Sequence, residues 1–273
     1  MVGDVAEPLG RRERVRAATI QEIKDTARRT LAEDGVEGLS LRAIGRAMGM
    51  TAPGLYRYFS SREDLVIALI ADFYQELNDQ LEAILQGWPA EEVTSRLLAA
   101  CREFRLWSLR HRAEFSLLFG SPLPELAEQK QHHRDGIGNA NAAHEAGMRF
   151  AGIFGTLVTQ LYLARPFPVP ADDEIDPRLL PQLRDWCGTW PMPVPLGLGQ
   201  IFLTCWIQLY GMVSMEMFGH LDFALVDPEP MFEAVLRSLA DLLRVADSYR
   251  RPADPSPPAG GSDLPRPDGP PPA

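Results

Sequence analysis

The run from Ser40 to Leu65, SLRAIGRAMGMTAPGLYRYFSSREDL, constrains the fold most, because it holds the starts of successive short helices and one tight turn. Ser40 precedes apolar residues spaced three and four apart, and its hydroxyl can accept a hydrogen bond from the free amides of a helix start. Gly49 follows the last apolar residue, where a chain leaving a helix often takes a positive φ. The pattern predicts a short helix from about residue 41 and a turn at 48–50.

Two further helix starts follow the turn. Thr51 is expected to cap a second short helix, with Pro53 in its first turn, where a missing amide proton does no harm. Ser61 followed by Asp64 indicates a variant of the capping box at the start of a third helix. Two short helices joined by a turn often form a purely structural hairpin. The order of these motifs, with two tyrosines and an arginine beside them, favours a helix-turn-helix DNA reader instead.

This segment resembles the DNA-binding domain of the TetR family of bacterial transcription regulators, over roughly residues 13 to 70. The resemblance rests on LRAIGRAMGMT, GLYRYF and SREDL in that order. Arg62 stands where the family usually has lysine, and either side chain would bring a charge to a phosphate. Pro53 inside the recognition helix is expected to alter how residues 51–53 meet the bases. We expect DNA contacts, with Arg57 as the best single choice, at Ser40, Arg42, Thr51, Ala52, Pro53, Gly54, Tyr56, Arg57, Tyr58 and Arg62.

The formal net charge of −10, taken over the whole chain, argues against a nucleic-acid partner. The charge is not distributed evenly along the chain, however. Residues 11–64 hold eleven Lys and Arg against eight Asp and Glu, a balance of +3, which leaves −13 for the remainder. Arg11, Arg12, Arg14 and Arg16 gather at the front of this basic part. We expect residues 1–12 to form a flexible basic arm that reaches phosphates or a minor groove, with a merely solvated tail as the alternative.

The segment from Pro195 to Met215 is uncharged and long enough to cross a bilayer. A polar stripe of Gln200, Thr204 and Gln208 argues against a membrane, since lipid would leave it unsatisfied. A helix that is apolar nearly all round is instead expected to lie between its own core and a partner. Residues 229–246 supply a second apolar helix, so that two such hairpins form a four-helix bundle in a homodimer. The alternative is that both helices only complete a monomeric core. We expect the dimer interface at Leu203, Ile207, Met215, Phe232, Leu236, Leu239 and Leu243.

The local sequence from Trp206 to Leu221 also resembles one recurrent type of TetR C-terminal domain, through WIQLYG at 206–211 and FGHL at 218–221. That resemblance implies a ligand-responsive regulator. Aromatic residues in the segment 91–190 and in the first apolar helix are candidates for a cavity that takes an apolar or aromatic effector, although core packing explains most of them equally well. These residues are Phe104, Trp107, Phe115, Phe119, Phe150, Phe154, Tyr162, Trp206 and Tyr210.

Proline-rich composition marks two stretches with little expected regular structure. Residues 165–195 are interpreted as a long connector, part of which folds back onto the body through Trp186 and Trp190. Residues 249–273 are expected to be a disordered tail rich in proline and glycine.

The predicted organisation is all-α. A three-helix helix-turn-helix domain at 13–70 is followed by a larger helical domain for ligand binding and dimerisation at 71–248.

No catalytic, cofactor or metal pattern is recognisable in the sequence. His132 and His133 are adjacent and would diverge on a helix, and the three cysteines lack a metal-binding spacing. We therefore expect no enzyme activity, no cofactor, no metal, and a cytoplasmic protein with reduced thiols. An all-helical enzyme or cofactor-binding protein, and a DNA-binding protein without a ligand, remain as the alternatives.

Overall fold

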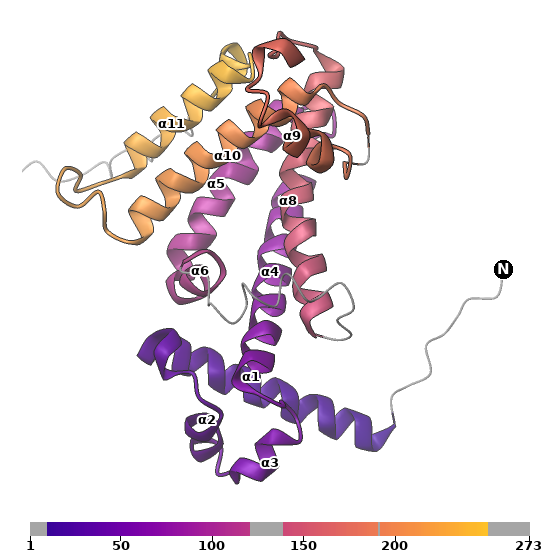
Figure 1. Cartoon of the computed structure of the whole chain (residues 1–273). Coiled ribbons are helices and arrows are strands. Elements are labelled where there is room, and N and C mark those ends of the chain that lie inside the picture. The colour runs from indigo at the N-terminus through magenta and orange to yellow at the C-terminus, as the bar shows by residue number, and fades with distance from the viewer. Residues whose placement is uncertain (1–9, 121–138, 191, 251–273) are drawn as a thin grey trace, which may run out of the picture.

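The computed structural model describes residues 10–120, 139–190 and 192–250, and no strand occurs in these ranges (Figure 1). The predicted all-α class is confirmed. The expectations for residues 1–9, for His132 and His133, and for the tail beyond residue 250 lie outside the described residues.

The N-terminal domain consists of α1 (Arg11–Gly38), α2 (Leu41–Ala47), α3 (Ala52–Tyr56) and the first half of α4 (Arg62–Gln86). Its core is formed by apolar side chains that these helices turn toward one another, and Ile23, Ile44, Leu55 and Phe59 are at most 3% exposed. In Figure 1 this domain forms the lower part of the molecule, with α1 lying across the base of α4.

Helix α1 changes the expectation for the basic arm. Its first residue is Arg11, so Arg11 and Arg12 are already helical, and Arg14 and Arg16 occupy its next turns. The four arginines therefore stand on a continuous helix. The expected arm is limited to residues before position 10, which lie outside the described part of the chain.

Helix α4 belongs to both domains. Its residues Leu65 to Phe73 pack in the N-terminal core, whereas Leu77, Leu81 and Leu85 pack in the core of the larger body. The boundary that we placed after residue 70 thus falls inside one unbroken helix. A rigid helix shared by two cores can transmit a displacement of one domain to the other.

The larger body consists of α5 (Val93–Arg110), α6 (Arg112–Phe119), α8 (Asn139–Ala164), α9 (Leu180–Cys187), α10 (Leu196–Met217) and α11 (Glu229–Leu242). Short 3-10 turns, η2 (Asp172–Glu174) and η3 (Ala246–Ser248), complete it. Figure 1 shows α10 and α11 side by side against α5, with α4 and α8 on the other side.

The connector at 165–195 is more ordered than its composition indicates, because it contains η2 and α9. The prediction that its tryptophans fold back onto the body is confirmed. The Trp186 and Trp190 rings lie 5.6 and 5.5 Å from the ring of Phe202 on α10. Gly199 on α10 admits this packing, since an added Cβ would lie 2.5 Å from the Cys187 sulfur.

Among the described helices, only α10 is long and apolar enough to cross a membrane by length and composition. Its buried side chains pack in the body, and one of them is charged. Glu216 is 8% exposed and accepts two hydrogen bonds from Arg105 on α5, at 2.6 and 2.7 Å. Two other apolar side chains of α10 face outward, Ile207 at 67% and Met215 at 43% exposure.

The α11 residues predicted at the dimer interface are placed elsewhere by the structure. Phe232, Leu236, Leu239 and Leu243 are at most 5% exposed and belong to the core of their own chain. They cannot also face a partner without a change in the fold, so we withdraw them from the interface. Ile207 and Met215 face outward on α10, and Leu203 is half-buried.

Candidate DNA-binding interface and effector cavities

The turn between α2 and α3 has the local geometry that the sequence predicts. The Ser40 hydroxyl accepts from the Ala43 amide at 3.1 Å, and the Thr51 hydroxyl accepts from the Gly54 amide at 3.3 Å. Gly49 has a φ of +65°, which glycine adopts without strain. Ser61 caps α4 by accepting from the Asp64 amide at 3.1 Å. The caps at Ser40 and Thr51 stabilise the starts of the short helices α2 and α3, which intrinsic helix propensity alone would not stabilise.

The surface of α2 and α3 is polar and open. Of the residues predicted to contact DNA, five are exposed: Arg42, Thr51, Pro53, Tyr56 and Arg57. Ser40, Ala52, Gly54, Tyr58 and Arg62 are half-buried, whereas Phe59 is buried in the core, as expected. The exposed residues lie at the start of α2, on α3 and at the two positions that flank α3. Hydroxyl and guanidinium groups are therefore exposed together on this part of the domain.

Two arginines outside the predicted set lie beside this surface. Arg16 of α1 donates to the Arg57 carbonyl oxygen at 3.4 Å, and its guanidinium lies 5.2 Å from the Tyr58 ring centre. Arg46 is exposed one turn after Arg42 on α2. The i, i+4 spacing of Arg42 and Arg46 was a usable signal, whereas the contact between Arg16 and α3 spans 41 residues and has none.

Arg62 has a structural role that the sequence does not reveal. Its Nε donates to the Leu39 carbonyl oxygen at 2.7 Å, and its Nη2 donates to the Val36 carbonyl oxygen at 2.9 Å. These oxygens end α1, so the guanidinium ties the start of α4 to the segment that leads into α2. Phosphate contact by Arg62 stays a prediction, and it would have to use the nitrogen that these bonds leave free.

The aromatic residues predicted to bind an effector mostly pack against each other. Phe104 lies at the centre, with the rings of Phe119, Phe150 and Trp206 at 5.6, 5.6 and 5.8 Å. Phe104, Trp107 and Phe115 are fully buried, and Phe150 and Phe154 nearly so. Tyr162 packs apart from this cluster on Phe167, at 5.3 Å. The aromatic cluster therefore fills the interior of the body, and open space lies on either side of it.

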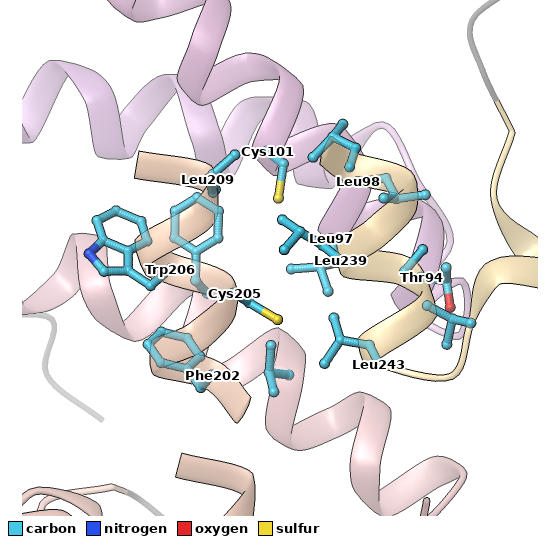
Figure 2. Close-up of a pocket in the computed structure, with 15 residues that line it drawn as sticks. Thr94, Leu97, Leu98, Cys101, Phe202, Cys205, Trp206, Leu209, Leu239 and Leu243 are labelled. Atoms are coloured by element: carbon cyan, nitrogen blue, oxygen red, sulfur yellow. The ribbon is translucent and has the colours of Figure 1, made fainter. Parts of the chain in front are cut away.

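On one side, a narrow void of about 40 Å³ separates α5, α8, α10 and α11. We call it the apolar void (Figure 2). Phe154 and Trp206 are the two predicted aromatic residues that line it. Among the described residues that line it, Thr94 alone has a hydroxyl, and Figure 2 shows the sulfurs of Cys101 and Cys205 directed into the void. Burial raises the pKa of both thiols to about 12, so they are neutral groups at ordinary pH.

On the other side, a wider space of about 430 Å³ lies between the two domains. We call it the interdomain hollow. The predicted residues Phe119 and Tyr210 line it, and the Tyr210 hydroxyl donates to the Phe119 carbonyl oxygen at 2.5 Å. Among the described residues, its lining consists of Val36, Glu37, Ser116, Leu117, Phe119, Gly120, Tyr210 and Phe218.

Comparison with known proteins assigns the chain to a family. The model of the bacterial regulatory proteins of the tetR family matches residues 23–69, and that of the tetracyclin repressor-like C-terminal domain matches residues 97–239, over half of the chain. The chain belongs to the TetR family. An HTH-type transcriptional regulator of Mycobacterium tuberculosis is 30% identical to it over 244 residues, which cover 86% of this chain and 96% of that protein.

Solved structures of similar fold extend this assignment. A regulatory protein with a TM-score of 0.64 is 27% identical and covers 85% of this chain and all of its own. A TetR/AcrR-family regulator from Thermobifida fusca, at a TM-score of 0.50 and 18% identity, is similar in fold over 86% of this chain and all of its own. This TetR-family chain is thus a DNA-binding transcription regulator with a helix-turn-helix domain and a larger helical domain.

The two domains of this TetR-family protein are joined by a charged cluster beside α4. Arg28 of α1 donates to Glu76 of α4 at 2.8 Å and to Glu114 of α6 at 2.7 Å. The His111 ring lies against the same guanidinium, at 3.3 Å between Nδ1 and Nη2. Although burial acts against ionisation, the hydrogen bond and charge of Arg28 keep the pKa of Glu76 below its usual range. A displacement of α6 must therefore move or break contacts with α1.

Proposed function

We propose that this TetR-family regulator binds operator DNA as a homodimer in the cytoplasm and changes its DNA affinity when an apolar or aromatic small molecule enters the helical body. The observation that carries the proposal is the pairing of two exposed surfaces. One is the capped α2–α3 unit, and the other is the outward apolar face of α10 around Ile207. Release of DNA by the effector, as in a repressor, is the direction that we propose.

The DNA-binding step follows from the exposed face of α3. Thr51, Ala52, Pro53 and Arg57 are the side chains proposed to reach base edges, with Arg57 able to take a guanine through two hydrogen bonds. Ser40, Arg42, Tyr56 and Tyr58 are proposed to contact phosphates, and Gly54 allows a close approach of the backbone.

Dimer formation follows from the outward face of α10. Ile207, Met215 and the adjoining Leu203 are proposed to pack against the same residues of a second copy, because an isologous interface uses one patch twice. Gly211 supports this arrangement. A Cβ added there would meet nothing within 4 Å in its own chain, although glycine within a helix costs about 1 kcal/mol relative to alanine. A partner helix packed closely against α10 would explain why the small residue glycine stands at this position.

The effector step follows from the apolar void. A space of about 40 Å³ admits only a few atoms, so an effector that enters it must move α10 away from α11. Since α10 also carries the proposed dimer face, this movement would change the separation of the two α3 helices. An effector that prefers the released state a hundredfold supplies about 2.7 kcal/mol for this change.

A selection of genomic fragments with the purified protein tests the DNA step, and repetition with cell extract tests the effector step. The recovered sites should be palindromes with half-sites about one helical turn apart, roughly 34 Å. Arg57→Ala should relax the preference at one position of each half-site, while Arg110→Ala, on the exposed surface of α5 in the larger domain, should leave it unchanged. Failure to recover any common sequence would contradict the proposal.

A further inference from the structure

We infer that the interdomain hollow is a second small-molecule site, separate from the apolar void, and that it takes a protonated amine with an apolar or aromatic body. The binding itself does not depend on the proposed function. Only its effect on DNA affinity does.

The wall of the hollow supplies a surface for the apolar body of such a ligand. The Phe119 and Tyr210 rings lie 6.0 Å apart, and Phe218, at the end of α10, is 43% exposed. Leu117 and Val36 continue this surface toward the N-terminal domain. A cation placed over aromatic faces is attracted by the ring quadrupoles, and the attraction grows as water is excluded.

The polar side chains among the described residues of the hollow can offer a ligand only hydrogen-bond acceptors. The Ser116 hydroxyl donates its proton to the Arg112 carbonyl oxygen at 2.9 Å, and the Tyr210 hydroxyl donates to the Phe119 carbonyl oxygen. Only the lone pairs of these hydroxyls remain for a ligand. Glu37 adds a carboxylate, for which no ion pair is found among the described residues. A ligand must therefore bring donors or positive charge, and an anion would meet the carboxylate unfavourably.

The size and position of the hollow fit a ligand with a regulatory effect. Its volume of about 430 Å³ lies within the range of small-molecule sites, roughly 300 to 1,000 Å³. Figure 1 shows α6 next to the C-terminal end of α1, so one occupant touches both domains. The Val36 carbonyl oxygen that borders the hollow accepts from Arg62, the first residue of α4. An occupant that moves Val36 therefore acts on the start of the helix that leads out of the DNA-binding unit.

Two ligands with the same apolar body and opposite charge test the inference. Binding of 2-(1-naphthyl)ethylammonium and of 3-(1-naphthyl)propionate to the full chain is measured by calorimetry in the absence of DNA. We expect the cation to bind at least fivefold more tightly than the anion. Glu37→Gln should remove this preference, because it replaces the carboxylate by a neutral amide of the same shape. Phe218→Ala should weaken the binding of both ligands.

A matched control separates the site from the general negative charge of the protein. Glu33→Gln changes an exposed carboxylate four residues earlier in the chain, outside the described lining of the hollow, and should leave the preference intact. Equal binding of the two ligands, no binding of either, or an equal effect of both glutamine variants would overturn the inference. Because DNA is absent, none of these results depends on the operator. An effect of the cation on operator affinity is measured separately.

Discussion

At the scale of single residues, Arg62 shows why arginine and lysine are not interchangeable at one position, although both carry a positive charge. The guanidinium donates from two nitrogens to two carbonyl oxygens, Val36 and Leu39, which point at it from the end of α1. A lysine ammonium is one point charge on a flexible stem and cannot reproduce this fork. From the sequence alone, arginine and lysine at this position are predicted to be equivalent phosphate contacts. The carbonyl partners lie 23 and 26 positions earlier, so no local pattern indicates the two hydrogen bonds.

Arg62→Lys is predicted to lower the free energy of unfolding by about 1–2 kcal/mol, since the site is half-buried and one charged hydrogen bond is lost. Urea denaturation followed by circular dichroism measures this change. Arg42→Lys, on an exposed side chain of the same domain, should leave stability within about 0.5 kcal/mol. If Arg62→Lys were as neutral as Arg42→Lys, the two hydrogen bonds would not hold the domain together.

The buried thiols give a prediction for alkaline pH. Burial raises the pKa of Cys101 and Cys205 to about 12 from the ordinary thiol value of 9.0. Between these values the unfolded chain has released each proton and the folded chain has kept it. Stability therefore falls as pH rises, by about 1.4 kcal/mol per pH unit for each thiol. Cys205→Ala should reduce that slope between pH 9 and pH 12 by up to the contribution of one thiol, about 1.4 kcal/mol per pH unit. Urea denaturation at several pH values measures the change. An unchanged slope would show that Cys205 is not protected.

At the scale of elements, the sequence predicts helix starts well and the partners of apolar faces poorly. The caps at Ser40, Thr51 and Ser61 depend on residues within three positions, so a single sequence contains the whole signal. The face of α11 that carries Phe232 and Leu236 is equally visible as a pattern. The pattern does not indicate whether residues of the same chain or a second copy cover that face. In the structure, residues of the same chain cover it.

The same limit applies to the aromatic residues of the predicted effector site. Their spacing shows that they face inward, but it cannot show that Phe104, Phe115 and Phe150 fill the interior among themselves. The space that remains depends on packing between helices far apart in the chain. Phe154 and Trp206 border the apolar void, whereas Phe119 and Tyr210 border the interdomain hollow.

The ion pair between α5 and α10 is a feature of helix packing that can be tested. Arg105 and Glu216 are each 8% exposed, and the guanidinium also lies 5.0 Å from the Phe232 ring centre on α11. Glu216→Leu alone is predicted to cost about 3–5 kcal/mol of stability, because it leaves the Arg105 charge buried without its partner. The double variant Arg105→Met with Glu216→Leu should recover most of this loss. Urea denaturation of the wild type, the two single variants and the double variant gives the coupling energy, and a double variant no more stable than Glu216→Leu would contradict the prediction.

At the scale of the whole molecule, in the dimer that we propose, the outward face of α10 would determine whether one reading unit or two can engage DNA. Ile207 is 67% exposed in a helix that is otherwise largely apolar, and the family to which the chain belongs supplies a use for that exposure. A charge at this position would meet its own copy across a two-fold axis, so both repulsion and desolvation oppose association. Because Ile207 makes few contacts within its own chain, the fold of the protomer should not change.

Ile207→Glu is therefore predicted to shift the protein from dimer to monomer in sedimentation experiments. Its operator affinity should fall by at least tenfold, because two half-sites can no longer be bound together. Met148→Glu places the same charge on an apolar residue of α8 that is 51% exposed, and should leave both properties unchanged. A dimer that persists in Ile207→Glu but dissociates in Met148→Glu would place the interface on α8, and the two reading units would then be spaced by a different pair of helices.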